Sequence, residues 1–257
     1  MQFLTASNGH RLAFHEVKGQ GPTVIWCGGL KSDMEGGKAT HLHIWAENAG
    51  QSYIRFDYFG HGKSDGEFID GTISQWANDV SDIIKHAPHN DIILIGSSMG
   101  GWASLLAAIE NPVRVKALVL IAPAPDFTEK LTYANFTEAQ KAALDKDGVV
   151  YLPSNYGEPY AYSKDLIEDG RKRQILDNDI PINIPIQILQ GREDAVVPWS
   201  YSLQIVEKVI STDVSYTLVK GGDHSLSRPE DLCRLERTVS EMIVNLTHLK
   251  TNTAPLK

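Results

Sequence analysis

Short apolar runs alternate with longer amphipathic stretches along most of the chain. The runs that predict β-strands are 3–5, 12–16, 23–27, 53–56, 92–95, 117–121, 186–190 and 214–219. The stretches that predict helices are 38–48, 74–86, 98–110, 200–210 and 229–249. In the second of these, apolar side chains recur at the spacing of one helical face, at Trp76, Val80, Ile83 and Ile84. The first two strands flank Asn8-Gly9, a pair that favours a tight hairpin turn.

The order of these elements predicts an α/β fold. Runs 92–95 and 117–121 are apolar without interruption, which is typical of strands covered on both faces. Strands that alternate with helices form mostly parallel sheets, because each helix crosses one face to reach the next strand. We therefore expect a twisted, mostly parallel sheet of eight strands with helices on both faces.

The alternation is interrupted between Pro123 and Pro185. This part contains a helical pattern at 138–145 and a polar helical pattern at 164–176. Its tyrosines are Tyr151, Tyr156, Tyr160 and Tyr162. We interpret residues 123–185 as a cap inserted into a single domain that spans 1–257, and call them the cap segment. The alternative is a second packing layer with no role in binding.

Composition and charge narrow the class of protein. Hydrophobic residues make up 42% and charged residues 22%, the balance of an ordinary globular protein. A net charge of -8 argues against a nucleic-acid binder, which normally has a basic face. The basic run 171–173 is interpreted as a solvated helix face. No run approaches the ~18–20 apolar residues of a membrane span.

The ends of the chain and its cysteines favour a reducing compartment. Residues 1–5 lack the basic start and the long apolar core of a signal peptide, so we expect a cytoplasmic protein. Cys27 and Cys233 are isolated and do not form a disulfide framework, so we expect both thiols to be free. Neither cysteine has the neighbours that mark a zinc site.

The candidate nucleophile is Ser98, in the motif Gly96-x-Ser98-x-Gly100. The bare motif arises by chance in about one chain in ten of this length, but here it follows a buried strand and opens a helix. A sharp strand-to-helix turn exposes the serine hydroxyl, and the flanking glycines allow the close approach of the backbone. Ser97 falls outside this glycine frame. The alternative is that Ser98 only caps the helix.

A serine hydroxyl needs a base to take its proton, and His224 is the candidate. It follows the last predicted strand and lies beyond a pair of glycines that allows its loop to bend. His61, in a glycine-rich loop after the strand 53–56, is the main rival. We interpret His61 as structural, because it precedes the serine, whereas the order that accompanies this serine motif is serine, acid, histidine.

The acid that orients the base is expected after the strand 186–190. Asp194 lies there and would accept the Nδ1 proton of His224. Glu193 is adjacent and stays open as an alternative. Asp223 is next to the base in sequence and is badly placed to reach the far side of the ring. Asp213 precedes the last strand and is interpreted as a turn residue.

Acyl transfer also requires donors for the developing oxyanion. The backbone amide of Met99, which follows the nucleophile, is one candidate. The loop 28–33 after the strand 23–27 begins with two glycines, and we expect the amide of Leu30 to be the second donor. The alternative is an ordinary glycine turn.

With these residues identified, the chain resembles the α/β-hydrolase superfamily over almost its full length. It is most similar to the α/β-hydrolase-domain-containing group that includes a mitochondrial acyl-protein thioesterase. The segments that carry the resemblance are 29–34, 54–58, 96–102, 194–199, 211–214 and Asp223-His224. The resemblance implies esterase or thioesterase chemistry on a fatty acyl chain, with Ser98, Asp194 and His224 as triad. The missing transit peptide indicates a bacterial relative outside any organelle.

The expected reaction is a two-step acyl transfer through an acyl-enzyme, with no metal and no organic cofactor. The expected partner is an ester or thioester substrate, with no nucleic acid and no membrane span, and the oligomeric state stays open. A cofactor-free perhydrolase would use the same triad. Outside enzymes, the alternative is a ligand-binding protein that keeps the fold without catalysis. An aminopeptidase would need an acidic pocket for the substrate amine, and the sequence identifies none.

Overall fold

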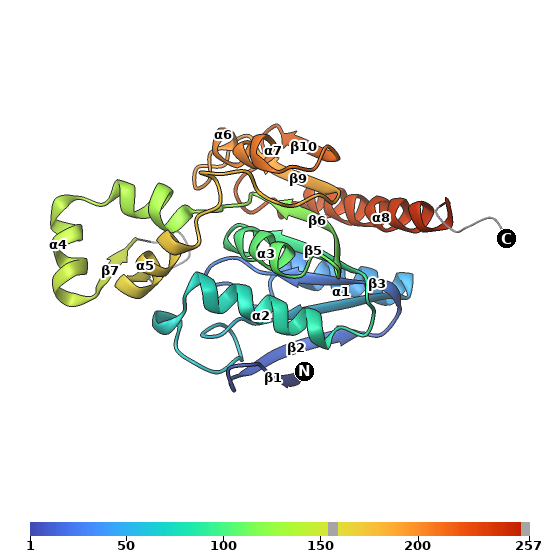
Figure 1. Cartoon of the computed structure of the whole chain (residues 1–257), viewed down its shortest axis with the longest axis horizontal. Helices are drawn as coiled ribbons and strands as arrows, with labels where there is room; N and C mark the ends of the chain where they lie inside the picture. The colour runs from blue at the N-terminus through green and yellow to red at the C-terminus, as the bar shows by residue number, and fades with distance from the viewer. Residues whose placement is uncertain (154–158, 253–257) are drawn as a thin grey trace.

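The computed structural model describes residues 1–153 and 159–252, built around a sheet of eight strands (Figure 1). The order across the sheet is β1-β2-β4-β3-β5-β6-β9-β10. The strands are β1 (Gln2–Thr5), β2 (Arg11–Val17), β3 (Gln20–Cys27), β4 (Gln51–Phe56), β5 (Ile92–Ser97), β6 (Val115–Ile121), β9 (Ile186–Gly191) and β10 (Val214–Val219). Only β1 with β2 and β2 with β4 pair antiparallel in this sheet. The mostly parallel α/β-hydrolase fold expected from the sequence is confirmed.

Helices cover both faces of this sheet. They are α1 (Gly37–Ala49), α2 (Ile73–His86), α3 (Met99–Glu110), α6 (Trp199–Ser202), α7 (Gln204–Lys208) and α8 (Pro229–Asn252). Figure 1 shows α2 and α3 in front of the sheet and α1 and α8 behind it.

Two hydrophobic clusters, one on each face, fix the central strands. In β5, Leu94 packs in the cluster that contains α2 and α3, and its neighbour Ile95 packs in the cluster that contains α1 and α8. Burial of each such side chain stabilises the fold by about 1.5–3 kcal/mol. The uninterrupted apolar runs are therefore explained by burial on both faces.

The carboxyl ends of β3, β5, β9 and β10 lie at one edge of the sheet, because these strands run parallel. In open α/β sheets, ligands bind in the crevice outside this edge. The loops that carry Leu30, Ser98, Asp194 and His224 all begin there.

The cap segment forms a layer of its own at one end of the molecule (Figure 1). It contains η2 (Thr128–Thr132), η3 (Tyr133–Asn135), α4 (Glu138–Asp147), β7 (Val149–Leu152), β8 (Tyr160–Ser163) and α5 (Lys164–Lys172). A capping box between Thr137 and Gln140 starts α4. The antiparallel pair β7–β8 was not expected. Tyr156, named in the aromatic stretch, lies outside the described residues.

Two predicted helices are shorter than expected. The predicted helix 164–176 ends at Lys172, because the carboxylate of Asp126 accepts the amides of Ile175 and Leu176 and draws them out of the helix. The predicted helix 200–210 is divided into α6 and α7. The break is at Leu203, whose carbonyl accepts the amide of Val206 in a tighter, three-residue turn.

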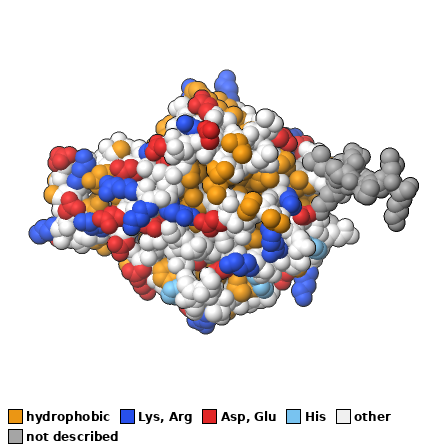
Figure 2. Space-filling model, in the orientation of Figure 1, with side chains coloured by type: hydrophobic (Ala, Val, Ile, Leu, Met, Phe, Trp, Pro, Cys, Tyr) orange, Lys and Arg blue, Asp and Glu red, His pale blue; other side chains and the backbone are white. Residues whose placement is uncertain are grey.

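Charged side chains of both signs are interspersed over the cap end of the visible face (Figure 2). In the basic run 171–173, Arg171 pairs with Glu129 at 2.6 Å and Arg173 pairs with Glu110 at 2.5 Å. The run is therefore part of a mixed charged surface. In the described part of the chain, no helix is long and apolar enough to cross a bilayer.

Candidate active site

Ser98 lies at a strained turn between β5 and α3. Its backbone has φ 54° and ψ -118°, a left-handed conformation that L-residues rarely adopt. Any Cβ at Gly100 would collide with the carbonyl oxygens of Cys27 and Gly28. A Cβ at Gly96 would lie 2.6 Å from the carbonyl oxygen of Gly100. The glycines of the motif are therefore required by the close approach of backbone to backbone.

The side chain of Ser98 does not cap α3, and it contacts His224 instead. The Oγ of Ser98 lies 3.0 Å from Nε2 of His224. On the other side of the ring, Nδ1 of His224 donates to Oδ2 of Asp194 at 2.8 Å. The structure thus brings together three residues that come from three separate loops.

The acids left open by the sequence lie in different surroundings. Glu193 is exposed, whereas the side chain of Asp194 is fully buried beside the imidazole. Asp223 accepts the amide of Leu226 at 2.9 Å within its own loop. Asp213 donates its amide to Ser211 Oγ at 3.2 Å, which is a turn contact.

The carboxylate of Asp194 is held in its ionised form. Burial alone would raise its pKa, but the hydrogen bond and charge of His224, together with the amides of Val197 and Val196, outweigh burial and lower the pKa. The amides of Val196 and Val197 add to this effect by donating to Oδ1, both at 2.8 Å. An ionised carboxylate at this position favours the imidazole tautomer with its proton on Nδ1.

Gln190 is a site residue that sequence reasoning missed. Its Nε2 donates to Oδ2 of Asp194 at 2.9 Å, and its Oε1 accepts a hydrogen bond from Ser202 at 2.8 Å. Gln190 is fully buried at the end of β9. A polar side chain that ends an apolar strand next to the acid was the available signal.

Leu30 and Met99, the expected oxyanion donors, line the same cavity as Ser98 and His224. The loop that carries Leu30 approaches the nucleophile closely, since a Cβ at Gly29 would lie 3.5 Å from Cβ of Ser98. The Oγ of Ser32 donates to the carbonyl of Gly29 at 2.7 Å and tightens the loop.

His61 lies apart from the Ser98–His224 contact. It is 4% exposed, and burial lowers its pKa to about 4. Its Nδ1 donates to the carbonyl of Phe59 at 3.0 Å, and its Nε2 accepts the amide of Lys31 at 3.0 Å. Both ring nitrogens therefore serve the backbone, in agreement with the structural interpretation.

A cavity of about 820 Å³ opens over Ser98. On the cap side it is lined mainly by apolar and aromatic side chains, including Phe127, Leu131, Phe136, Leu152, Tyr160 and Tyr162. Elsewhere it is lined by polar residues, including Ser32, Asp33, Lys38, Ser225 and Ser227. Ligand sites commonly combine apolar walls with a few polar groups.

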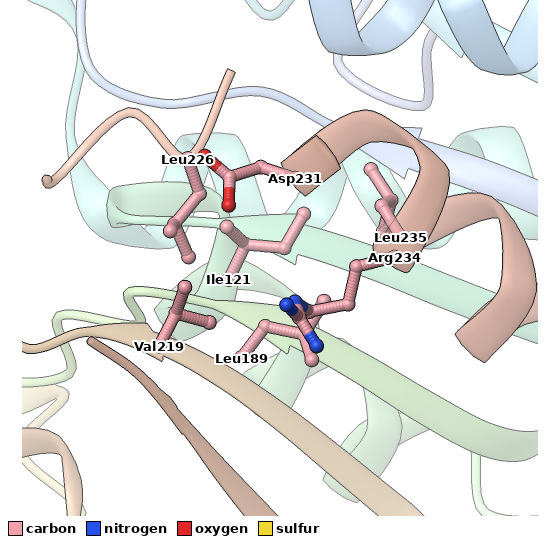
Figure 3. A pocket seen from close by; sticks show the side chains of 7 residues that line it. All are labelled: Ile121, Leu189, Val219, Leu226, Asp231, Arg234 and Leu235. Carbon is pink, nitrogen blue, oxygen red and sulfur yellow. The ribbon is translucent and has the colours of Figure 1, made fainter. Parts of the chain in front are cut away.

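A second hollow lies between the sheet and α8 (Figure 3). Ile121, Leu189 and Val219 face Leu226 and Leu235 across it. It has no space for a water-sized molecule and shares no lining residue with the large cavity. It is therefore packing between the helix and the sheet.

The other groups that could carry chemistry are the metal-ligating side chains and the two thiols. Among residues 1–153 and 159–252, no cluster of three or more His, Cys, Asp or Glu side chains is arranged to hold a metal ion. Cys27 is buried and Cys233 is exposed, and neither forms a disulfide within the described residues.

Comparison with known proteins places the chain in a family. The family described as serine aminopeptidase S33 (Hydrolase_4) matches residues 23–179. The human mitochondrial palmitoyl-protein thioesterase ABHD10 is 35% identical over 249 residues, which cover 96% of this chain and 81% of that protein. The chain belongs to the α/β-hydrolase family of serine hydrolases.

Two solved structures of α/β-hydrolases are similar to this chain over nearly their whole length. A putative hydrolase from Agrobacterium vitis S4 is 39% identical with a TM-score of 0.90, covering 94% of this chain and 98% of that one. Mouse α/β-hydrolase domain-containing protein 10 is 34% identical with a TM-score of 0.88, covering 95% of this chain and 98% of that one. The similarity in fold therefore extends over nearly the whole of this chain.

Proposed function

We propose that this α/β-hydrolase cleaves carboxylic esters or thioesters through an acyl-enzyme on Ser98. The observation that carries the proposal is the hydrogen-bonded series from Ser98 through His224 to Asp194, of which Ser98 and His224 line a cavity with an apolar side. A serine, a base and a buried acid in this geometry form the arrangement that activates a serine hydroxyl.

In the first step, Oγ of Ser98 attacks the carbonyl carbon while Nε2 of His224 takes the hydroxyl proton. Asp194 holds the ring and stabilises the imidazolium that forms. The tetrahedral intermediate collapses, the bond to the leaving alcohol or thiol breaks, and His224 returns the proton to the leaving group. Water then attacks the acyl-enzyme with His224 again as base, which releases the acid and restores Ser98.

We assign the oxyanion site to the backbone amides of Leu30 and Met99. Each donor at such a site contributes about 3–4 kcal/mol of transition-state stabilisation. Met99 is the first residue of α3, so its amide also lies at the positive end of the helix. Leu30 lies on the loop that approaches Ser98 from the end of β3.

The substrate class we propose is an acyl ester or thioester with a long apolar chain. The mouse and human relatives that match most of this chain are named palmitoyl-protein thioesterases. The apolar lining from the cap segment provides a surface for such an acyl chain. Transfer of an alkyl chain from water to such a surface contributes about 0.8 kcal/mol per methylene. The polar part of the cavity would face the leaving group or solvent.

A fluorophosphonate probe tests the nucleophile. The protein is expected to be labelled covalently, and Ser98→Ala is expected to abolish labelling and ester turnover. Ser97→Ala is the matched control and should keep both, because Ser97 lies outside the contact with His224. Labelling that survives Ser98→Ala would overturn the proposal.

Rates with p-nitrophenyl esters and acyl thioesters of graded chain length test the substrate class. We expect kcat/KM to rise with chain length. Turnover of aminoacyl p-nitroanilides in place of acyl esters would point to a peptidase. The absence of turnover with every ester and thioester would favour a ligand-binding protein, and a rate with peroxide above the hydrolysis rate would favour a perhydrolase.

A further inference from the structure

The backbone of the loop that carries Leu30 is held from outside the proposed triad. Ser32 donates its amide to the carbonyl of Gly29 at 3.2 Å, which makes residues 29–32 a tight turn. Lys31 has φ 57° in this turn, a conformation that costs energy for a residue with a side chain. Such a conformation persists only where the surrounding structure fixes it.

The group that fixes this turn is the imidazole of His61. Its Nε2 accepts the amide of Lys31 at 3.0 Å. That amide belongs to the peptide plane between Leu30 and Lys31, so its orientation sets the ψ angle of Leu30. The angle ψ of Leu30 in turn sets the direction of the Leu30 amide relative to the Leu30–Lys31 peptide plane.

The imidazole is prepared to act as an acceptor. Nδ1 donates to the carbonyl of Phe59 at 3.0 Å, which leaves the lone pair of Nε2 free for Lys31. The rings of Tyr58, Phe68 and Trp76 surround it with centroids at 5.7, 5.3 and 5.3 Å. This apolar setting disfavours the imidazolium, which would have no lone pair to offer.

The partner of Nδ1 is itself fixed to α2. The carbonyl of Phe59 also accepts a hydrogen bond from Nε1 of Trp76 at 3.1 Å. The amide of Phe59 donates to the carboxylate of Asp79 at 2.8 Å. The position of Nε2 is therefore set by the core of the protein.

A second contact from the same segment holds the far end of the loop. The buried carboxylate of Asp57 accepts the amide of Met34 at 2.6 Å and the amide of Lys63 at 2.8 Å. Asp57 and His61 thus hold the loop by hydrogen bonds to the backbone amides of Met34 and Lys31. The nucleophile approaches the same loop from β5, near Gly29.

We infer that His61 is a positioning residue for the oxyanion site, acting through the Leu30–Lys31 peptide. The inference rests on the proposed function, because it assumes that the Leu30 amide stabilises an oxyanion formed at Ser98. His61 itself exchanges no proton with the substrate. Its contribution is to the rate of the chemical step, with little effect on substrate binding.

The pair His61→Gln and His61→Met tests the inference. The two side chains are similar in length, but only glutamine offers a strong acceptor to the Lys31 amide. We expect His61→Met to lower kcat about 10- to 100-fold with KM within about twofold, because loss of one oxyanion donor costs about 100- to 1,000-fold. We expect kcat of His61→Gln to be at least about tenfold higher than kcat of His61→Met. The control His41→Met alters a histidine paired with Glu236 on α8 and should leave kcat unchanged.

A trifluoromethyl ketone supplies a readout that general loss of structure would not mimic. Its tetrahedral adduct on Ser98 places an oxyanion in the site, whereas a fatty acid product does not. We expect the Ki of the ketone to rise in His61→Met in proportion to the loss of kcat/KM, with product inhibition unchanged. Unfolding midpoints by circular dichroism establish that each variant is folded, and His61→Phe replaces His61→Met if the latter is not.

The outcomes separate the inference from the function beneath it. Equal kcat in folded His61→Met, His61→Gln and wild type would overturn the role of His61 while Ser98 labelling still supports the hydrolase. Equal losses in both variants at native stability would also overturn it, because the acceptor would then have no effect. Failure of Ser98 labelling in the wild type would remove the proposed function itself.

Discussion

At the scale of single residues, the site depends on how completely Asp194 is held. Its carboxylate accepts hydrogen bonds from the side chains of Gln190 and His224 and from the amides of Val196 and Val197. A buried carboxylate with this many donors stays ionised and cannot rotate. The imidazole is therefore oriented toward Ser98 in the absence of substrate, which would remove a reorganisation cost from the proposed reaction.

Asp194→Asn tests this orientation. The amide NH₂ of asparagine next to Nδ1 would favour the tautomer with the proton on Nε2, which cannot accept the proton of Ser98. We expect kcat to fall about 1,000- to 10,000-fold with KM little changed, measured by steady-state ester hydrolysis. Glu193→Gln, on the exposed neighbour, is the control and should keep the wild-type rate. A larger loss in the control than in Asp194→Asn would assign the acid to Glu193.

The sequence predicted that Ser98, Asp194 and His224 lie together. It predicted only part of the contacts that fix their positions. Ser98, Asp194 and His224 follow strands whose carboxyl ends share one edge, so the pattern of strands was enough to bring them together. The link from Gln190 to Asp194 depends on side-chain packing with Ser202, which is 12 positions away. The contact between His61 and Lys31 joins two loops and has no local signal. Such contacts are set by tertiary packing.

At the scale of elements, α2 contains a buried acid that the amphipathic pattern did not reveal. Asp79 is 0% exposed and accepts the amide of Phe59 and the side chain of Gln75. Burial raises its pKa from 3.8 to about 7, more than these hydrogen bonds lower it. The carboxyl is therefore protonated in the folded protein over a pH range in which the unfolded chain is ionised.

This difference predicts a pH dependence of stability. Between pH 3.8 and about 7, the folded state binds more protons at Asp79 than the unfolded state does, so its contribution to stability declines as the pH rises. Asp79→Asn removes this ionisation. The free energy of unfolding of the variant should therefore increase relative to that of the wild type as the pH rises across this range. The gain is at most about 4 kcal/mol, from about 1.4 kcal/mol for each tenfold change in proton affinity. Urea unfolding from pH 4 to pH 8 measures it.

Asp70→Asn, at an exposed acid just before α2, is the control for this experiment. It reports the effect of replacing an exposed carboxylate and is measured over the same pH range. A constant difference between Asp79→Asn and wild type from pH 4 to pH 8 would show that Asp79 ionises alike in both states.

The elements themselves were predicted where one physical signal dominated. The central runs of β5 and β6, at 92–95 and 117–121, are apolar without interruption because both faces are covered, and these runs were found directly. The hairpin β7–β8 was missed, because its strands are short and only partly buried and they alternate weakly between apolar and polar residues. The early end of α5 was missed for a different reason: the acceptor for Ile175 and Leu176 is Asp126, from the far end of the cap segment.

At the scale of the whole molecule, two parts of the chain form the walls of the cavity. The edge of the sheet presents Ser98, His224 and Leu30, and the cap segment supplies most of the apolar wall. The two ends of the cap segment are tied to each other through Asp126, whose carboxylate accepts the amides of Ile175 and Leu176. Under the proposed function, the sheet edge would carry the reacting groups and the cap segment would limit the length of the acyl chain.

A change in the cap wall should therefore alter chain-length preference without altering the chemistry. Leu131 lies in η2 and lines the cavity, so Leu131→Trp would fill space next to an acyl chain. Excluding two methylenes from an apolar wall costs about 1.6 kcal/mol, which corresponds to about a tenfold loss. We expect kcat/KM for hexadecanoyl esters to fall at least about tenfold while that for acetyl esters stays within about twofold. Tyr151→Trp is the matched control, because Tyr151 is 64% exposed on β7 and does not line the cavity. Equal losses for acetyl and hexadecanoyl esters would place the acyl chain elsewhere, because a wall that the chain contacts must discriminate by length.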